Sequence, residues 1–308
     1  MEAYLLHAEV DISSGLPGFC MVGSLNNEVK EAKERVQVAL KNAGYDLPPN
    51  KVTINLSPAN IRKEGTGYDV PIAIGILMSL GYFEKKACEE CLFIGELGLN
   101  GEIKPVSGIL PIVRAAQEGG MKCCLVPEDN SVEGSVIPGI KVRGVSDIRQ
   151  LVAFLQEEDE QCRDKILPVS HCTLHMIRAK NKEKEQPDFA QVRGQEAAKR
   201  AAEIAAAGFH NLLMEGPPGG GKSMIARRIP GILPELSEEE CLEVSAIYSV
   251  AGMLNAEEPL ITQRPFQSPH HTISNAALVG GGAKIRPGAI SLSHRGVLFV
   301  CETLCSTN

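Results

Sequence analysis

Tryptophan is absent from this chain of 308 residues, and aromatic residues make up only 4% of it. Hydrophobic residues nevertheless account for 44% of the sequence, so we expect cores packed from aliphatic side chains. No apolar run reaches the roughly 18 residues that a membrane span requires. A chain of this length is expected to hold about two domains, without a membrane-spanning segment.

The sequence also lacks a signal peptide and the cysteine spacing of a disulfide framework. Its ten cysteines therefore predict free thiols in a reducing, cytoplasmic compartment. One possible zinc group comprises Cys162, His171, Cys172 and His175. A second comprises Cys88, Cys91, Cys123 and Cys124. The first fits no standard structural-zinc spacing, and buried or half-buried thiols are the simpler interpretation of the second.

Aspartate and glutamate are missing from residues 259–301. The whole chain has a net charge of −7, which argues against a protein that coats nucleic acid non-specifically. The acid-free segment contains Arg264, His270, His271, Lys284, Arg286, His294 and Arg295. Two interpretations stay open: a local basic loop that binds a polyanion, or a solvated loop with scattered charges.

The motif on which the functional argument depends matches the phosphate-binding loop pattern G-x-x-x-x-G-K-[ST]. It comprises Gly216, Pro217, Pro218, Gly219, Gly220, Gly221, Lys222 and Ser223. Residues 211–215 are expected to form a short buried strand before it, and residues 224–229 to begin a helix after it. Lys222 is predicted to contact the β- and γ-phosphates of ATP, and the Ser223 hydroxyl to bind Mg²⁺. The alternative is a glycine-rich turn before a helix.

A phosphate-loop ATPase also needs a second apolar strand that ends in Asp-Glu, which fixes Mg²⁺ and orients the attacking water. Residues 297–300 are the expected strand, with residues 289–292 as its predicted partner. Cys301 stands at the Asp position, and a soft thiol is a poor partner for hard Mg²⁺. Glu302 is in place and is the candidate catalytic residue.

Strand and helix patterns alternate across residues 1–156, which predicts one α/β domain. Residues 26–42 are expected to form an amphipathic helix whose buried face comprises Val29, Ala32, Val36, Ala39 and Leu40. Residues 51–56 alternate as a half-buried strand, and Asp69 is expected to cap a second helix.

Residues 157–188 are rich in charge and show little periodicity, which predicts a linker. A second domain is expected over residues 189–308. Within it, Ser237 and the three glutamates that follow predict a capped helix that runs to about residue 249.

Several unusual motifs occur in an order that resembles a known family. The first half contains VDISSGLPGF, LSPANIRKEGTGYDVPIAIGIL and GELGLNGEIKPVSGILP, and the second contains VRGQEAAKRAAEIAAAGFHNLL, GPPGGGKSMIARRIPGILP, ITQRPFQSPHHTIS and ALVGGG. Together they resemble the ComM/YifB family of magnesium-chelatase-like AAA+ ATPases. The resemblance implies a Lon-protease-like (ribosomal S5 domain 2-like) α/β domain, also chelatase-subunit-I-like, followed by an incomplete P-loop AAA+ α/β domain. It also implies ATP and Mg²⁺ as cofactors, and hexameric rings that act on DNA, with branch migration in natural transformation as the best-described role.

The resemblance to Lon raises the question of proteolysis, because Lon uses a Ser–Lys dyad. Aligning the motifs places Gly67 at the nucleophile position and Leu110 at the lysine position. Thr66 lies beside the first of these and has no evident base. We therefore expect no proteolysis, and a role for the first domain in assembly or partner binding.

The sequence departs from the family pattern at both ends. The usual first strand is missing before Glu2, residues 301–306 replace the family's Asp-Glu-Leu-Pro-Glu-Phe, and the chain stops before the remaining ATPase elements. A truncated or frame-shifted gene product is the expectation. Three functions stay open: a DNA-acting ATPase motor whose hydrolysis Cys301 and the truncation put in question, a magnesium-chelatase-type ATPase subunit, or a non-hydrolysing nucleotide-binding or assembly remnant.

Overall fold

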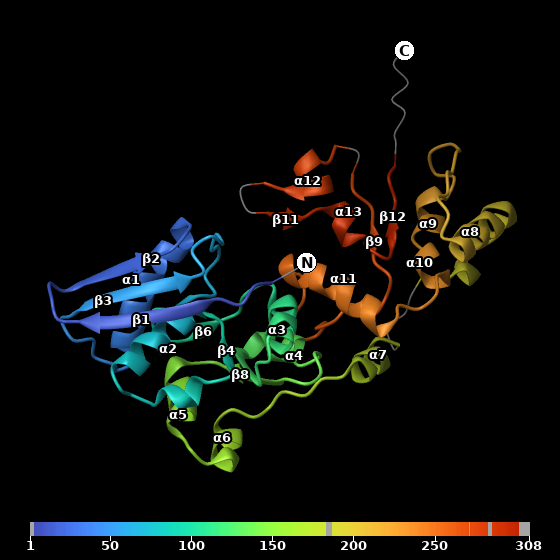
Figure 1. Cartoon of the computed structure of the whole chain (residues 1–308). Coiled ribbons are helices and arrows are strands. Elements are labelled where there is room, and N and C mark those ends of the chain that lie inside the picture. The colour runs from blue at the N-terminus through green and yellow to red at the C-terminus, as the bar shows by residue number, and fades with distance from the viewer. Residues whose placement is uncertain (1–2, 183–186, 271, 283–284, 302–308) are drawn as a thin grey trace. The chain divides into compact units, whose positions relative to one another are not determined.

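The structure is a computed structural model that describes residues 3–182, 187–270, 272–282 and 285–301 (Figure 1). The chain forms two compact units, Met1–Thr173 with Asn255–Glu257, and Leu174–Leu254 with Glu258–Asn308. Both units contain helices and strands, so the chain is a mixed α/β protein. Among the described residues, no helix combines the length and the hydropathy needed to cross a membrane.

The first unit begins with a three-stranded sheet in the order β1-β3-β2. It consists of β1 (His7–Ser13), β2 (Gly18–Val22) and β3 (Lys51–Ser57), where β1 is antiparallel and β2 parallel to β3. Helices α1 (Asn27–Asn42) and α2 (Asp69–Ser79) pack on this sheet (Figure 1). β3 takes the central position because its alternate side chains, Val52, Ile54 and Leu56, are all buried.

Helix α1 confirms the amphipathic prediction residue by residue. Its buried side chains are Val29, Ala32, Val36, Ala39 and Leu40, and Asn26 caps its first turn by accepting the Val29 N–H at 3.0 Å. Asp69 does not cap α2, because the residue at the cap position is Tyr68 and it makes no side-chain cap bond. The Asp69 carboxylate instead binds the Arg35 guanidinium through two hydrogen bonds of 2.7 and 2.9 Å. The expected cap is therefore a buried link between α1 and α2.

A second sheet, wholly parallel, has the order β4-β7-β8. Its strands are β4 (Cys91–Phe93), β7 (Cys123–Pro127) and β8 (Lys141–Val145). No pattern in the sequence indicates β8, because its two basic residues, Lys141 and Arg143, interrupt the apolar pattern. The surrounding elements are η1 (Lys85–Cys88), β5 (Glu96–Leu97), β6 (Ile103–Lys104), α3 (Ile109–Glu118), η2 (Glu128–Asn130), α4 (Ser131–Gly134) and α5 (Ile148–Gln156).

The segment 157–188, predicted to be a linker, contains two helices. Helix α6 (Glu160–Ile166) belongs to the first unit, where Asp164 pairs with Arg143 at 2.6 Å. Helix α7 (Leu174–Lys182) belongs to the second unit, where Arg178 donates to the Leu236 carbonyl. The division between the compact units therefore falls between these helices, which a lack of periodicity alone does not reveal.

The second unit contains short elements. Its helices are η3 (Phe189–Gln191), α8 (Glu196–Gly208), α9 (Lys222–Ala226), α10 (Ile229–Ile232), α11 (Glu238–Val250), α12 (Asn275–Val279) and α13 (Ala289–Leu292). Its strands are β9 (Phe266–Gln267), β10 (Gly280–Gly281), β11 (Arg286–Pro287) and β12 (Val297–Leu298). β10 pairs with β11 and β12 with β9, the latter in parallel.

Two sequence predictions for this unit have opposite outcomes. Ser237 accepts the Glu240 N–H at 3.1 Å and its own N–H binds the Glu240 carboxylate at 2.9 Å, so the capped helix is confirmed as α11. The pairing of residues 289–292 with residues 297–300 is wrong, because residues 289–292 form α13 and the partner of β12 is β9.

Candidate nucleotide-binding site

The phosphate-loop residues 216–223 form a turn that leads directly into α9. Gly219 and Gly221 have φ angles of 80° and 85°, a region that glycine adopts without the steric penalty of a Cβ atom. The Gly220 N–H donates to the Pro217 carbonyl at 3.1 Å and closes the turn. Glycine at positions 219 and 221 is thus required by the backbone path of the loop.

Lys222 and Ser223, the two side chains expected to contact phosphate and Mg²⁺, open helix α9. The Lys222 ammonium group donates to the carbonyls of Gly216 and Pro217, at 2.6 and 2.9 Å. These bonds fold the side chain back over the loop, and the Ser223 side chain is exposed beside it. The structure therefore brings a cation and a hydroxyl together at one end of the loop.

The residues before the loop do not form the expected strand. Residues 211–215 have no strand pairing among the described residues, and the Leu213 side chain is 84% exposed. A strand forms only where a neighbouring strand accepts and donates its backbone hydrogen bonds. β12, the described strand at the expected second motif, pairs with β9 and not with residues 211–215. The prediction of a buried strand at residues 211–215 is thus wrong for this structure.

The second apolar strand is shorter than expected but in the predicted place. β12 covers Val297–Leu298, and the stacked rings of Phe266 and Phe299, 6.4 Å apart, extend its contact with β9. Cys301, at the position of the metal-binding aspartate, is exposed. Glu302, the candidate catalytic residue, lies outside the described residues.

The acid-free segment is partly neutralised by the acidic helix α11. Arg295 pairs with Glu240 at 3.4 Å and with Glu243 at 3.2 Å, and His294 lies 3.5 Å from Glu243. The hydrogen bond from Arg295 is the main reason that the pKa of Glu243 lies below its ordinary value. Among the described residues, the exposed Arg286 on β11 is a cation of this segment without such a partner. The basic character seen in sequence is therefore smaller in the folded unit.

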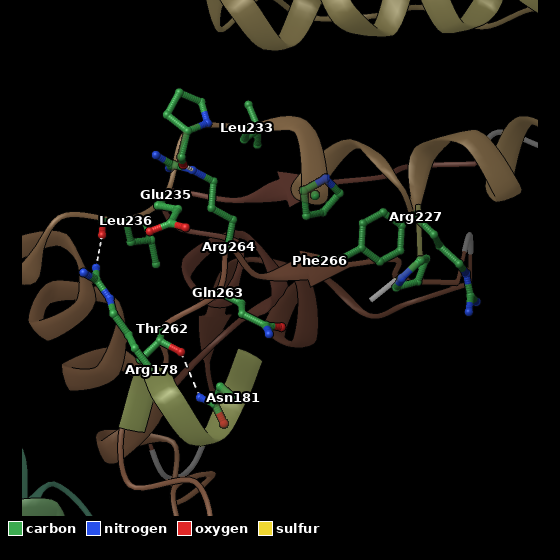
Figure 2. Close-up of a pocket in the computed structure, with 14 residues that line it drawn as sticks. Arg178, Asn181, Arg227, Leu233, Glu235, Leu236, Thr262, Gln263, Arg264 and Phe266 are labelled. Carbon is green, nitrogen blue, oxygen red and sulfur yellow. Dashed lines mark hydrogen bonds between the residues drawn. The ribbon is translucent and has the colours of Figure 1, made fainter. Parts of the chain in front are cut away.

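A pocket of about 510 Å³ lies in the second unit and shares no residue with the phosphate loop (Figure 2). Its lining includes the guanidinium side chains of Arg178, Arg227 and Arg264. Two of these bind backbone carbonyls of other lining residues: Arg178 donates to the Leu236 carbonyl, and Arg264 donates to the Pro234 carbonyl. Figure 2 also shows Asn181 bonded to the Thr262 hydroxyl, at 2.8 Å. No pattern in the sequence indicates these residues, because the pocket joins segments far apart in the chain.

The residues at the Lon-like catalytic positions have structural contacts. A Cβ atom at Gly67 would lie 3.1 Å from the Ile94 side chain, so this position fits glycine closely. Leu110 is buried in α3, and the Thr66 hydroxyl donates to the Glu96 carboxylate. In the described part of the chain, neither candidate zinc group assembles three or more residues that could bind a metal ion.

Comparison with known proteins adds to this geometry. The family model described as magnesium chelatase, subunit ChlI, matches residues 188–305, and the model for subunit ChlI of Mg-chelatase matches residues 8–130. YifB of Escherichia coli K12, itself uncharacterized, is 44% identical over 294 residues, which is 96% of this chain and 56% of that protein. Competence protein ComM of Haemophilus influenzae is 39% identical over 303 residues, or 98% and 58% of the two chains.

This chain belongs to the ComM/YifB family of magnesium-chelatase-like proteins. It spans somewhat more than half the length of the curated relatives it matches. Lon protease of Mycolicibacterium smegmatis is a more distant relative, with 25% identity over 165 residues, 50% of this chain and 21% of that protein. The motif-based resemblance stated from the sequence is therefore confirmed at the level of the family.

Proposed function

We propose that residues 216–223 bind ATP with Mg²⁺, as the nucleotide site of an AAA+ ATPase module. The observation that carries this proposal is the loop itself, with left-handed glycines at 219 and 221 and the Lys222 ammonium folded over it. Its donors also fit the ligand. An ammonium group, a hydroxyl and backbone N–H groups at the start of a helix all complement a polyphosphate and its metal ion.

Each side chain has a distinct role in this proposal. Lys222 exchanges its two carbonyl partners for the β- and γ-phosphates, and Ser223 supplies one oxygen ligand to Mg²⁺. The metal, when bound, neutralises charge that develops on the phosphates. Glu302 orients the attacking water, while the Cys301 thiol cannot replace a carboxylate in holding the water shell of a hard cation. Binding is therefore retained and hydrolysis is slow.

Nucleotide binding is tested by titrating a fluorescent ATP analogue with Mg²⁺ against the whole chain. Lys222→Ala removes hydrogen bonds to a charged ligand, worth about 1.5–3 kcal/mol, so we expect affinity to fall roughly 10- to 150-fold. Lys199→Ala is the matched control, since it removes a lysine of α8 whose ammonium group pairs with Glu196 at 3.3 Å and which is not part of the loop. Equal affinities for the wild type and Lys222→Ala would refute the assignment of residues 216–223 as the nucleotide site.

Hydrolysis is tested separately by phosphate release. We expect turnover by the wild-type chain to be close to that of Lys222→Ala, and to rise in Cys301→Asp, which restores a hard ligand beside Glu302. Cys20→Ser replaces another exposed cysteine and serves as the control. Steady wild-type turnover well above that of Lys222→Ala would contradict the non-hydrolysing part of the proposal while leaving nucleotide binding intact.

We further propose that the family module works as a cytoplasmic homo-oligomeric ring on DNA, as a branch-migrating motor. Two facts support this: one relative is named a competence protein, and Arg286 offers an exposed cation on a segment without acidic residues. Sedimentation of the ATP-bound protein measures assembly, and titration with labelled single- and double-stranded DNA measures binding. A purified oligomer that binds ATP but no DNA would exclude the DNA function alone.

The description of both family models favours one alternative, an ATPase subunit that supports insertion of Mg²⁺ into a porphyrin. The Lon relationship across half of the chain argues for the ComM-like function over this one. Metal insertion in the presence of chelatase partner subunits distinguishes the two. Activity that depends on Lys222 in that assay would favour the chelatase subunit.

A further inference from the structure

Two cysteines lie directly opposite each other in the parallel sheet of the first unit. Cys91 on β4 pairs in register with Cys123 on β7, so the two side chains leave the same face of the sheet. Neighbouring strands are about 4.7–4.9 Å apart, which lies within the Cα separation of about 4.4–6.8 Å found in disulfides. Both residues are free thiols in this structure.

A buried arginine lies on the same face of the sheet. β8 pairs Leu125 with Arg143, two residues along from Cys123, so the side chains of Cys123 and Arg143 share a face. The Arg143 guanidinium is fixed by its bonds to the Leu167 carbonyl and to Asp164. Its Nε atom is buried and has no hydrogen-bond partner within the described residues. A fixed cation with an unused N–H group thus faces the thiol pair.

This environment distinguishes the thiols from one another. Contact with the Cys91 thiol, followed by the charge of Arg143, holds the pKa of Cys123 below its ordinary value. The pKa of Cys91 is raised, first by the same contact and then by burial. Burial raises the pKa of Cys88 to about 11 and that of Cys124 to about 12. Because the thiolate is the reactive form and Cys123 shares its sheet face with the fixed Arg143 guanidinium, we assign Cys123 as the nucleophile and Cys91, opposite it in register, as its partner.

We propose that Cys91 and Cys123 form a redox-active dithiol, which a hydroperoxide oxidises to a disulfide across strands β4 and β7. The Cys123 thiolate attacks the terminal oxygen of the peroxide, the O–O bond breaks, and a sulfenic acid is formed while hydroxide leaves from hydrogen peroxide, or an alkoxide from an organic hydroperoxide. The Cys91 sulfur then attacks the Cys123 sulfur, and its proton leaves with the departing hydroxyl as water. Two electrons pass from the thiols to the peroxide in total. Cys91 is half-buried and Cys123 is buried, so we expect solvent to reach the pair past Cys91.

The test uses the whole reduced chain at low concentration, treated with one equivalent of hydrogen peroxide, alkylated and digested with trypsin. Cleavage after Lys86, Arg114, Lys122 and Lys141 leaves Cys88 and Cys91 in one peptide, residues 87–114, and Cys123 and Cys124 in another, residues 123–141. We expect these peptides to be joined by a bond that dithiothreitol breaks. Fragmentation of the joined pair assigns the bond to Cys91 and Cys123 without any substitution.

Variants provide matched controls. The cross-link should persist in Cys88→Ser and Cys124→Ser, and should be lost in Cys91→Ser and in Cys91→Ala, whose folds are checked by circular dichroism. A cross-link that survives either Cys91 substitution would overturn the proposal. So would oxidation confined to the exposed Cys20 and Cys301 in the wild-type chain.

Discussion

β3 of the first unit and residues 211–215 of the second invite a direct comparison, because the sequence predicts a short strand in both. In β3, Ile54 is fully buried, every residue pairs with β1, and residues 51–55 also pair with β2. Leu213, by contrast, is 84% exposed and has no described strand beside it. Apolar sequence therefore gives a strand only where the fold provides partners on its flanks.

The same contrast extends over the two units as wholes. The large apolar core comprises residues from the first unit, from Val29 to Leu167. In the second unit, large apolar side chains are exposed on several elements: Ile204, Phe209, Leu213, Met253, Val279, Ile285, Ile290 and Val300. Exposed apolar side chains also occur in the first unit, at Leu16 and Leu99 for example, so the large buried core is what distinguishes it from the second unit. We therefore expect non-local stabilisation to be concentrated in the first unit.

The largest expected effect is at the buried ion pair of the first unit. Arg35→Ala leaves the Asp69 carboxylate, which is 0% exposed, without its guanidinium partner, and breaking such a pair typically costs about 3–5 kcal/mol. Urea unfolding measures this loss. Arg200→Ala provides the reference, because it removes an exposed arginine whose ion pair with Glu203 lies on the surface.

This loss should depend on pH in a defined direction. Burial already holds the pKa of Asp69 above its ordinary value in the folded state, and removal of Arg35, which opposes this shift, raises the pKa further. A raised folded pKa means that the folded protein binds more protons than the unfolded chain, so stability falls as pH rises between the two pKa values. The deficit of Arg35→Ala should therefore be smaller at pH 3 than at pH 7; an equal deficit would contradict this account.

A second pair of substitutions compares the two predicted strands directly. Ile54→Ala in β3 should lower the free energy of unfolding by about 2–5 kcal/mol, because it opens a cavity in a packed core. Leu213→Ala should change it by less than about 0.5 kcal/mol, because the side chain is exposed. Urea unfolding of both variants measures the difference. A large effect of Leu213→Ala would show that this side chain is buried in solution.

The smallest effects test whether local interactions are alike in both units. Asn26→Ala removes the cap of α1 and Ser237→Ala the cap of α11. Each should cost about 0.5–2 kcal/mol, since a cap depends only on residues within one helical turn. Hydrogen exchange at the first amides of each helix measures the local opening. Similar losses would show that the two units differ in their long-range contacts and not in their local ones.

The reactive thiol pair illustrates what the sequence alone leaves open. Cysteines 91 and 123 were simply members of a group of four whose simplest interpretation was buried thiols. The register of β4 against β7 places the two side by side, and β8, an element that the sequence did not indicate, brings Arg143 to them. Their chemistry depends on two strand pairings between segments that lie far apart in the chain.

The sequence by itself determined the features that depend on neighbouring residues. The buried face of α1 follows from helical spacing, the cap of α11 from a serine followed three residues later by a glutamate, and the phosphate loop from glycines at fixed positions. The family followed from ordered motifs, which are also properties of the linear chain. In each case the partners lie within a few residues, so spacing along the chain is enough to identify them.

Tertiary structure alone decided the features that depend on distant partners. It placed β3 between β1 and β2, made Asp69 the partner of Arg35 and not a helix cap, and paired β12 with β9. It also left residues 211–215 without a strand partner in the described part of the chain. The physical reason is the same throughout. Strand pairing and buried ion pairs satisfy polar groups across long stretches of chain, and local pattern carries no information on which distant group arrives.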